Sequence, residues 1–222
     1  MKNRITLLIA GFLAATAATA QVTLVEYDWR DTPTANKLDP DTLAAGVSAT
    51  DMAEIGDVDG QAGISNFSGN SLTIKRNALD SNLSNSNNSL TFTLSATNPG
   101  EVLDVDTLDM TFNSIGGNDL FSFEIFADAG SGEQSLFTTG PNLENFANTS
   151  QSYDVSTVAN SASIDFRIEY ASASTGAANY SLQTANIGVT GVTAIPEPSS
   201  YALLGGLGAL ALAVVRRRRI GS

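Results

Sequence analysis

The chain has 222 residues and lacks histidine and cysteine, and its 23 acidic and 11 basic residues give a net charge of −12. The missing residue types exclude a Ser-His-Asp triad, a cysteine nucleophile, disulfide bonds and a zinc site with the usual ligands. An acidic surface repels phosphate, so we expect no nucleic-acid partner. Carboxylate chemistry and hard-metal binding through oxygen ligands remain open.

Residues 1–20 have the pattern of a secretory signal peptide. Lys2 and Arg4 form a charged start, Ile5 to Leu13 form an apolar run, and Ala18-Thr19-Ala20 is a small-residue cleavage site. We predict export through the secretion translocon and cleavage between Ala20 and Gln21. An uncleaved N-terminal anchor is the alternative, although it would require a longer apolar span.

Residues 21–194 are predicted to form a single exported domain, because this length is enough to bury one core. Six of the eleven basic residues lie in the two terminal segments, so five remain against 22 of the 23 acids, a net charge of −17. Such a charge favours cations or neutral polymers as partners.

The domain alternates apolar and polar residues with the period of a β-strand. In chain order, strands are predicted at Val22–Tyr27, Leu72–Ile74, Leu90–Leu94, Leu108–Phe112, Phe121–Ile125, Ile164–Ile168 and Tyr180–Val192. Stretches rich in Ser, Asn and Gly separate them, as expected for turns. Only Leu43 to Ile55 could hold a short helix. The pattern predicts an all-β fold, an antiparallel β-sandwich that is jelly-roll-like.

The last predicted strand, Tyr180 to Gly191, resembles the closing strand of carbohydrate-binding jelly-roll modules, in which an Asp/Asn-Ile/Val step precedes the last alternating residues. Here Asn186-Ile187 takes that place. The alternative is a plain strand of a sandwich that binds no ligand.

Two acidic clusters are candidates for calcium. Asp57 and Asp59 are two residues apart and precede Gly60, which makes them a fragment of a calcium loop without its remaining ligands. Asp104 and Asp106 alternate with apolar residues and fit the solvated face of a strand equally well. Apart from calcium at these sites, no cofactor is expected. Solvated acids are the alternative for both clusters.

No pair of carboxylates stands out as a glycosidase pair, and we expect no enzymatic activity. A carbohydrate site usually includes an aromatic platform, and Trp29 is the single tryptophan. Its position at the end of a predicted strand favours packing in the core over a platform.

Residues 195–222 have the composition of a processing and sorting tail. Pro196-Glu197-Pro198 is followed by an apolar run from Tyr201 to Val215 and then by four basic residues, Arg216, Arg217, Arg218 and Arg219. The run is somewhat shorter than the roughly 20 residues that a membrane helix prefers. The arginines place the C-terminus in the cytoplasm by the positive-inside rule. An anchor that is never cleaved is the alternative.

This order of elements resembles the PEP-CTERM sorting signal of Gram-negative bacteria. The resemblance implies that Pro196, Glu197 and Pro198 are recognised by exosortase, a membrane-embedded cysteine protease that cuts close by. It also implies transient anchoring in the inner membrane, followed by release or attachment at the cell surface or in the extracellular matrix.

The expected function is therefore a non-enzymatic component of the cell surface or extracellular matrix. A carbohydrate-binding module that acts on extracellular polysaccharide, with or without calcium, is the alternative.

Overall fold

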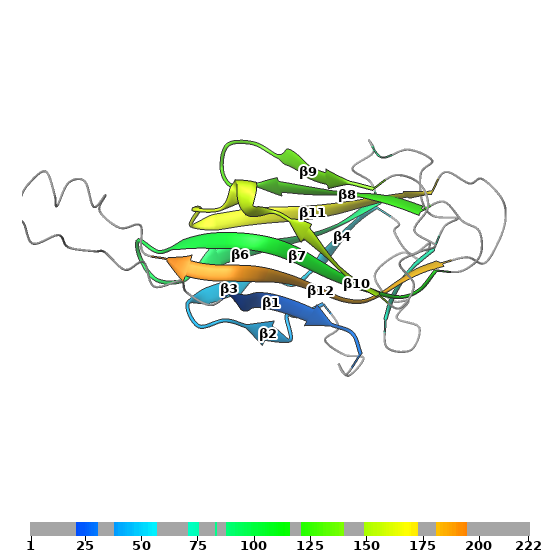
Figure 1. Cartoon of the computed structure of the whole chain (residues 1–222), viewed down its shortest axis with the longest axis horizontal. Helices are drawn as coiled ribbons and strands as arrows, with labels where there is room; N and C mark the ends of the chain where they lie inside the picture. Colours follow the sequence, from blue (N-terminus) through cyan, green and yellow to red (C-terminus); the bar gives the residue numbers. More distant parts are fainter. Residues whose placement is uncertain are drawn as a thin grey trace, which may run out of the picture.

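The structure, a computed structural model, describes residues 21–30, 38–56, 71–75, 83, 88–115, 121–139, 149–172 and 181–194 (Figure 1). They form strands and one 3-10 turn. The elements are β1 (Val22–Asp28), β2 (Thr42–Leu43), β3 (Val47–Ala49), β4 (Ala53–Gly56), β5 (Leu72–Lys75), β6 (Asn88–Ala96), β7 (Val102–Ile115), β8 (Phe121–Asp128), β9 (Gln134–Thr138), β10 (Thr149–Asp154), η3 (Ser156–Val158), β11 (Ser163–Ser172) and β12 (Ser181–Ala194).

The strands form two antiparallel sheets. In sheet A the order is β10-β7-β12-β1-β2, and β5 also pairs with β12. In sheet B the order is β3-β6-β11-β8-β9, and β4 also pairs with β6. The prediction of an all-β antiparallel fold is confirmed.

The connectivity is that of a chain folded back on itself as one long hairpin and then wrapped into two layers. β8 pairs with β9, β7 with β10, β6 with β11 and β1 with β12. Successive pairs fall in alternate sheets, which is the strand order of a jelly roll.

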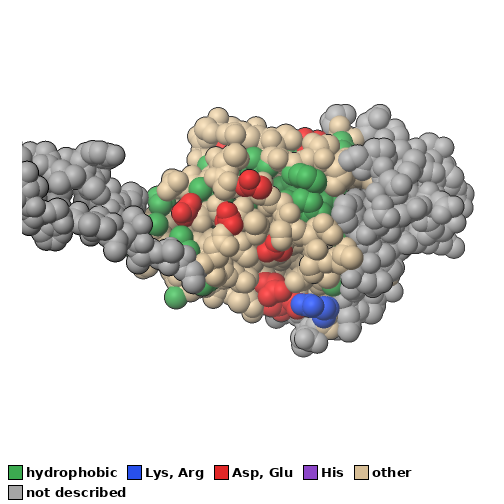
Figure 2. Space-filling model, viewed as in Figure 1, with side chains coloured by type: hydrophobic (Ala, Val, Ile, Leu, Met, Phe, Trp, Pro, Cys, Tyr) green, Lys and Arg blue, Asp and Glu red, His purple; other side chains and the backbone are tan. Residues whose placement is uncertain are grey.

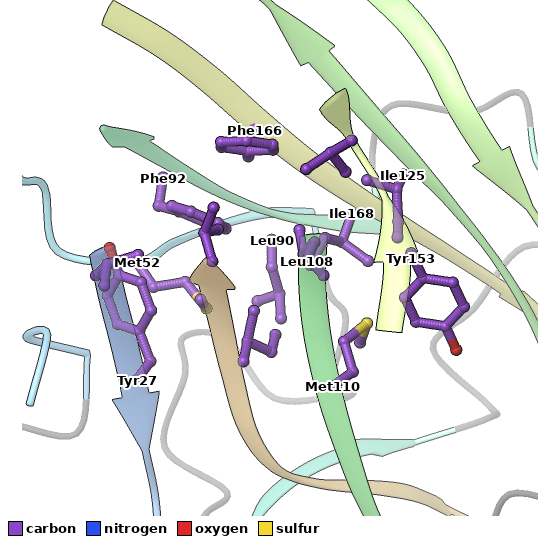
Figure 3. Close-up of a cluster of buried hydrophobic side chains, with 14 of the residues drawn as sticks. Tyr27, Met52, Leu90, Phe92, Leu108, Met110, Ile125, Tyr153, Phe166 and Ile168 are labelled. Carbon is purple, nitrogen blue, oxygen red and sulfur yellow. The ribbon is translucent and has the colours of Figure 1, made fainter. Parts of the chain in front are cut away.

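One hydrophobic core lies between the sheets, because the inward residues of every long strand are apolar. Phe92 of β6 stacks on Phe166 of β11 with ring centroids 5.2 Å apart, and Tyr27 of β1 lies 5.3 Å from Phe92. Figure 3 shows these rings in one cluster with Leu108 and Met110 of β7. The aromatic contacts therefore join sheet A to sheet B.

All seven predicted strands are present, but the short helix at Leu43 to Ile55 is wrong. That segment forms β2, β3 and β4, which lie along the edges of both sheets by pairing with β1 and β6. Val47 and Met52 enter the core from this segment, and Met52 donates its backbone N–H to Leu38 O (2.8 Å). Pairing with the free edges of β1 and β6 therefore determines the structure of this segment more strongly than its local sequence pattern does.

The predicted signal peptide, the Pro196-Glu197-Pro198 motif and the predicted helix 201–215 lie outside the described residues. Within the described ranges, no helix is both long enough and apolar enough to cross a membrane.

A β-bulge interrupts the pairing of the two longest strands. Thr190 pairs with Thr107 and Gly191 with Val105, so that Asp106 is the extra residue on β7. The backbones approach closely here, because a Cβ built on Gly191 would lie 2.3 Å from the Asp104 carbonyl oxygen and 2.9 Å from Val105 Cα. Only glycine fits without a backbone shift.

Substitution of Gly191 by alanine should lower the free energy of unfolding by about 2 kcal/mol, the usual cost of forcing a backbone shift in a packed region. Gly188→Ala is the matched control, because a Cβ there meets Val25 O at an ordinary 3.4 Å. Urea unfolding followed by the fluorescence of the buried Trp29 measures both. Equal losses in the two variants would contradict the close approach at Gly191.

Candidate binding groove on sheet B

A groove of about 510 Å³ crosses the outer face of sheet B. Its floor comes from β6 and β11, one wall from the segment around β4, and the other wall from the turn between β8 and β9. Its lining residues are Thr50, Asp51, Ala53, Ile55, Thr91, Phe92, Thr93, Asp128, Glu133, Asp165, Phe166 and Arg167.

The alternation of β6 and β11 places polar groups on the floor. Phe92 and Phe166 face the core, so Thr93 and Asp165 on the same strands face outward. They lie in neighbouring strands, and the Thr93 hydroxyl donates to Asp165 Oδ1 (2.6 Å). The floor therefore presents hydroxyl and carboxylate oxygens directly above the core.

Local hydrogen bonds fix both walls. Thr50 donates its N–H to Thr93 O (3.0 Å), and Thr93 donates its N–H to Thr50 Oγ1 (3.0 Å). On the opposite side, the N–H groups of Gly130 and Gly132 donate to Asp128 Oδ1 at 2.7 and 3.0 Å. Both glycines have positive φ, which lets the turn close around the carboxylate. Hydrogen bonds within the protein therefore hold both walls of the groove in position.

Arg167 is held in place by three neighbours. Its Nε and Nη2 donate to the two carboxylate oxygens of Glu133 at 2.7 and 2.6 Å, and Nη1 donates to Glu169 Oε2 at 2.8 Å. The guanidinium carbon lies 3.9 Å from the ring centroid of Phe126. Glu169 is only 2% exposed, so Arg167 neutralises a buried carboxylate.

These contacts change the ionisation of both partners. The hydrogen bonds from Arg167 hold the pKa of Glu133 below its usual range, and the bonds to Glu133 raise the pKa of Arg167. Folding lowers the pKa of Glu133 from its usual value of 4.5. The ionised carboxylate therefore stabilises the fold at pH values above 4.5, and this contribution is lost as the pH falls through the lowered pKa. The ion pair therefore persists at neutral pH.

The carboxylates of the groove other than Glu133 set its chemistry. Asp51, Asp128 and Asp165 are hydrogen-bond acceptors, while Arg167 is occupied by Glu133 and Glu169. Beside the groove, partial loss of hydration and the Asp51 carboxylate raise the pKa of Asp39. The groove thus offers acceptors to hydroxyl or ammonium donors and repels anions.

The aromatic rings of the described residues leave little surface for sugar stacking. Trp29 is 1% exposed, which confirms its predicted place in the core. Phe126, on the same face as the groove, has Arg167 over its ring. Sugar recognition here would depend on hydrogen bonds more than on stacking.

The predicted metal sites receive no support from the described part of the chain. Asp57 and Asp59 lie outside it. Asp104 and Asp106 line a second cavity of about 240 Å³ with Gln21 and Ser156, and Asp106 accepts a hydrogen bond from the Gln21 amide. Among the described residues, no three acidic side chains gather closely enough to hold a metal ion.

The second outer face is polar as well. In sheet A, hydroxyl groups pair across strands, Thr107 with Thr190 at 2.7 Å and Thr111 with Ser150 at 2.8 Å. On the face shown in Figure 2, acidic side chains are scattered among uncharged polar groups, and the basic side chain in view lies beside acidic ones.

The strand predicted at Ile164–Ile168 alternates apolar residues with Asp165, Arg167 and Glu169, but the sequence does not show that these charged residues border a groove. Glu133 lies between β8 and β9, and its pairing with Arg167 spans 34 residues. The sequence feature that could have indicated an ion pair here is the single basic residue between two acidic residues on the polar face of β11.

The chain is an acidic protein with an antiparallel β-sandwich fold. A comparison with family models identifies a sorting motif at its C-terminal end. Residues 194–219 match the PEP-CTERM protein-sorting motif. The chain therefore carries this motif, which confirms the expectation from Pro196-Glu197-Pro198 and the arginine cluster, and implies export and membrane-associated sorting. No curated protein sequence matches the chain significantly.

Several solved structures resemble the chain distantly. The C-terminal domain of a chitobiase from Bacteroides fragilis is 11% identical, with 68% of this chain and 96% of that chain covered and a TM-score of 0.34. The family 32 carbohydrate-binding module of NanJ from Clostridium perfringens, in complex with galactose, is 14% identical, with coverages of 66% and 94% and a TM-score of 0.30. At these scores the likeness carries no conclusion about a ligand of this chain.

Replacement of Arg167 by methionine should destabilise the protein by about 3 kcal/mol, because Glu169 would be left buried without its cation. Adding Glu169→Gln in the same chain should recover part of the loss, since a neutral amide is less costly to bury than a charge. Urea unfolding at neutral pH measures both variants. A loss below about 1 kcal/mol, typical of exposed pairs, would show that this ion pair is not effectively buried.

Proposed function

We propose that the chain is a non-enzymatic exported protein of the cell surface or extracellular matrix, sorted and cleaved through its C-terminal signal. The observation that carries the proposal is the PEP-CTERM motif over residues 194–219. It begins at Ala194, the last residue of β12, so the sorting signal follows the sandwich directly.

The proposed route begins with a signal peptide that is recognised by the secretion translocon and removed between Ala20 and Gln21. The helix 201–215 then holds the precursor in the inner membrane, and Arg216 to Arg219 remain on the cytoplasmic side. An exosortase cuts near Pro196-Glu197-Pro198, and the sandwich is released or attached at the surface.

Two features support a role without catalysis. The sequence supplies neither histidine nor cysteine for general-base or nucleophilic chemistry. The cation of the groove, Arg167, is bound on both sides by Glu133 and Glu169. Its engagement favours a structural role over stabilisation of a reacting anion.

Mass spectrometry of the secreted protein should find a chain that begins at Gln21 and lacks Arg216 to Arg219. Glu197→Ala in the full-length precursor should leave the tail attached and move the protein to the membrane fraction, because the proposed recognition element is changed. Ser200→Ala, just beyond the motif, is the control and should be processed normally. Retention of the arginines in the wild-type surface protein would overturn the proposal.

A second candidate is a carbohydrate-binding module, favoured by the preformed groove on sheet B. Its carboxylates and threonine hydroxyls fit the hydroxyl groups of a neutral polysaccharide, and its negative charge disfavours an anionic one. This candidate requires a discrete, saturable site rather than general surface association.

Retention of the secreted protein on the host's extracellular polysaccharide, with calcium and with a chelator, tests this candidate. If the groove binds, Asp165→Ala should weaken retention by about tenfold, the effect expected for a lost charge-assisted hydrogen bond. Asp154→Ala on sheet A is the matched exposed control. Equal retention of both variants and the wild type would exclude the groove, and loss with chelator alone would direct attention to Asp57 and Asp59.

A further inference from the structure

The last three residues of β12, Val192–Ala194, are held less firmly than the rest of the strand, and we refer to them as the terminal segment. From Asn186 to Gly191, β12 lies between β1 and β7. The pairing with β1 ends where Val22 meets Gly191. Beyond that point the terminal segment pairs only with β7, in the register Val192–Asp104, Thr193–Leu103 and Ala194–Val102.

The bulge at Gly191 separates the terminal segment from the strand before it. The register of β12 on β7 shifts between Thr190 and Gly191. A bulge breaks the continuity of a ladder, so pairing on one side of it does not enforce pairing on the other. The terminal segment can therefore open without disturbing the pairs from Leu182 to Thr190.

Few backbone hydrogen bonds retain the terminal segment. Leu103 donates its N–H to Ser161 O (2.7 Å) and accepts a bond from Asn160 N (2.7 Å), both on the side of β7 that faces away from β12. Thr193–Leu103 is thus a non-hydrogen-bonded pair, and only the two flanking pairs can bond. The same contacts keep buried Leu103 in place when the terminal segment leaves.

The burial of the terminal segment is also incomplete. Val192, Thr193 and Ala194 are half-buried, whereas Ile187 and Val189 of the same strand are fully buried. Val192 lines the cavity of about 240 Å³ that also contains Asp104 and Gln21. Opening would therefore expose little apolar surface, and opening free energies are lowest in such regions.

The sorting motif begins very close to this ladder. Pro196 is two residues beyond Ala194, and a residue that precedes proline is restricted to extended conformations. Proteins that recognise an extended peptide use its backbone N–H and C=O groups. Those of Val192 and Ala194 cannot bond to β7 and to a protease at the same time.

We propose that the terminal segment is a gate for tail processing: Val192–Ala194 must unpair from Val102–Asp104 before the sorting protease can grip the chain at Pro196-Glu197-Pro198. The gate rests on the proposed function, because it requires that the tail is cleaved near this motif. The rate of cleavage then scales with the open population, which falls tenfold for each 1.4 kcal/mol of opening free energy.

A linker insertion tests the gate in the full-length precursor, expressed in its host and followed by pulse-chase. Four residues, Gly-Ser-Gly-Ser, inserted between Ala194 and Ile195 move the motif away from the ladder and should speed processing at least about threefold, a change that corresponds to roughly 0.65 kcal/mol of opening. The same insertion between Ser199 and Ser200, beyond the motif, is the matched control and should not speed it.

A reversible lock provides a second variant. Val102→Cys combined with Ala194→Cys places two thiols on a hydrogen-bonded antiparallel pair, where Cα atoms are about 5.5 Å apart, within disulfide range. The natural sequence has no cysteine, so no other pairing competes. The disulfide should reduce processing at least about tenfold, and a reductant should restore it. Each single-cysteine variant controls for changes in recognition.

The outcomes separate the gate from the function on which it rests. Faster processing with the linker and reversible arrest with the disulfide support the gate. A wild-type rate after insertion at Ala194, or in the disulfide-bonded form confirmed by thiol labelling, overturns the gate alone. A wild-type chain that never loses Arg216 to Arg219 overturns the proposed function and the gate with it.

Discussion

The pairing of β7 with β12 is the contact on which the rest of the sandwich depends. Both strands are 14 residues long, and they pair from one end to the other with three register shifts. β10 attaches to the free side of β7, and β1 attaches to the free side of β12. Leu108, Met110 and Ile187 on these two strands are fully buried, so the same pairing that builds sheet A forms one side of the core. Because the chain has no disulfide, burial of this surface is the main source of its stability.

An acidic protein must place its carboxylates so that they neither enter the core nor repel one another strongly. In this sandwich the period of the strands directs them outward, where hydroxyl groups accompany many of them: Ser152 donates to Asp109, Thr93 to Asp165 and Ser135 to Glu124. Glu169 is the exception, since it is buried and needs Arg167. The one arginine of β11 therefore neutralises a carboxylate that lies on the polar face of the strand and is nevertheless buried.

The core strands could be predicted from sequence because each has two neighbours and buries one whole face. β9 and β10, each at the end of its sheet, could not, for the same physical reason. β10 buries only Tyr153 within its span, and every residue of β9 is half-buried or exposed. Neither sequence therefore shows a clear alternation of apolar and polar residues. The groove was also beyond sequence reasoning, because its parts come from four separate segments and meet only through the order of sheet B. The sorting tail was the easiest to find, since its signal is local and depends on no tertiary contact.

The location of the chain ends connects the fold to its sorting. β1 begins at Val22 and β12 ends at Ala194, and Val22 pairs directly with Gly191, so the polypeptide enters and leaves the sandwich at the same end (Figure 1). A precursor held by the segment after Ala194 would have this end nearest the membrane. The groove is framed by Thr50–Ile55 and by the β8–β9 turn, and lies across sheet B, whereas both chain ends belong to sheet A. One wall of the groove lies toward this same end, because Ser161, which accepts a bond from Leu103 N–H beside Thr193, donates its hydroxyl to Ala129 O at the start of the β8–β9 turn.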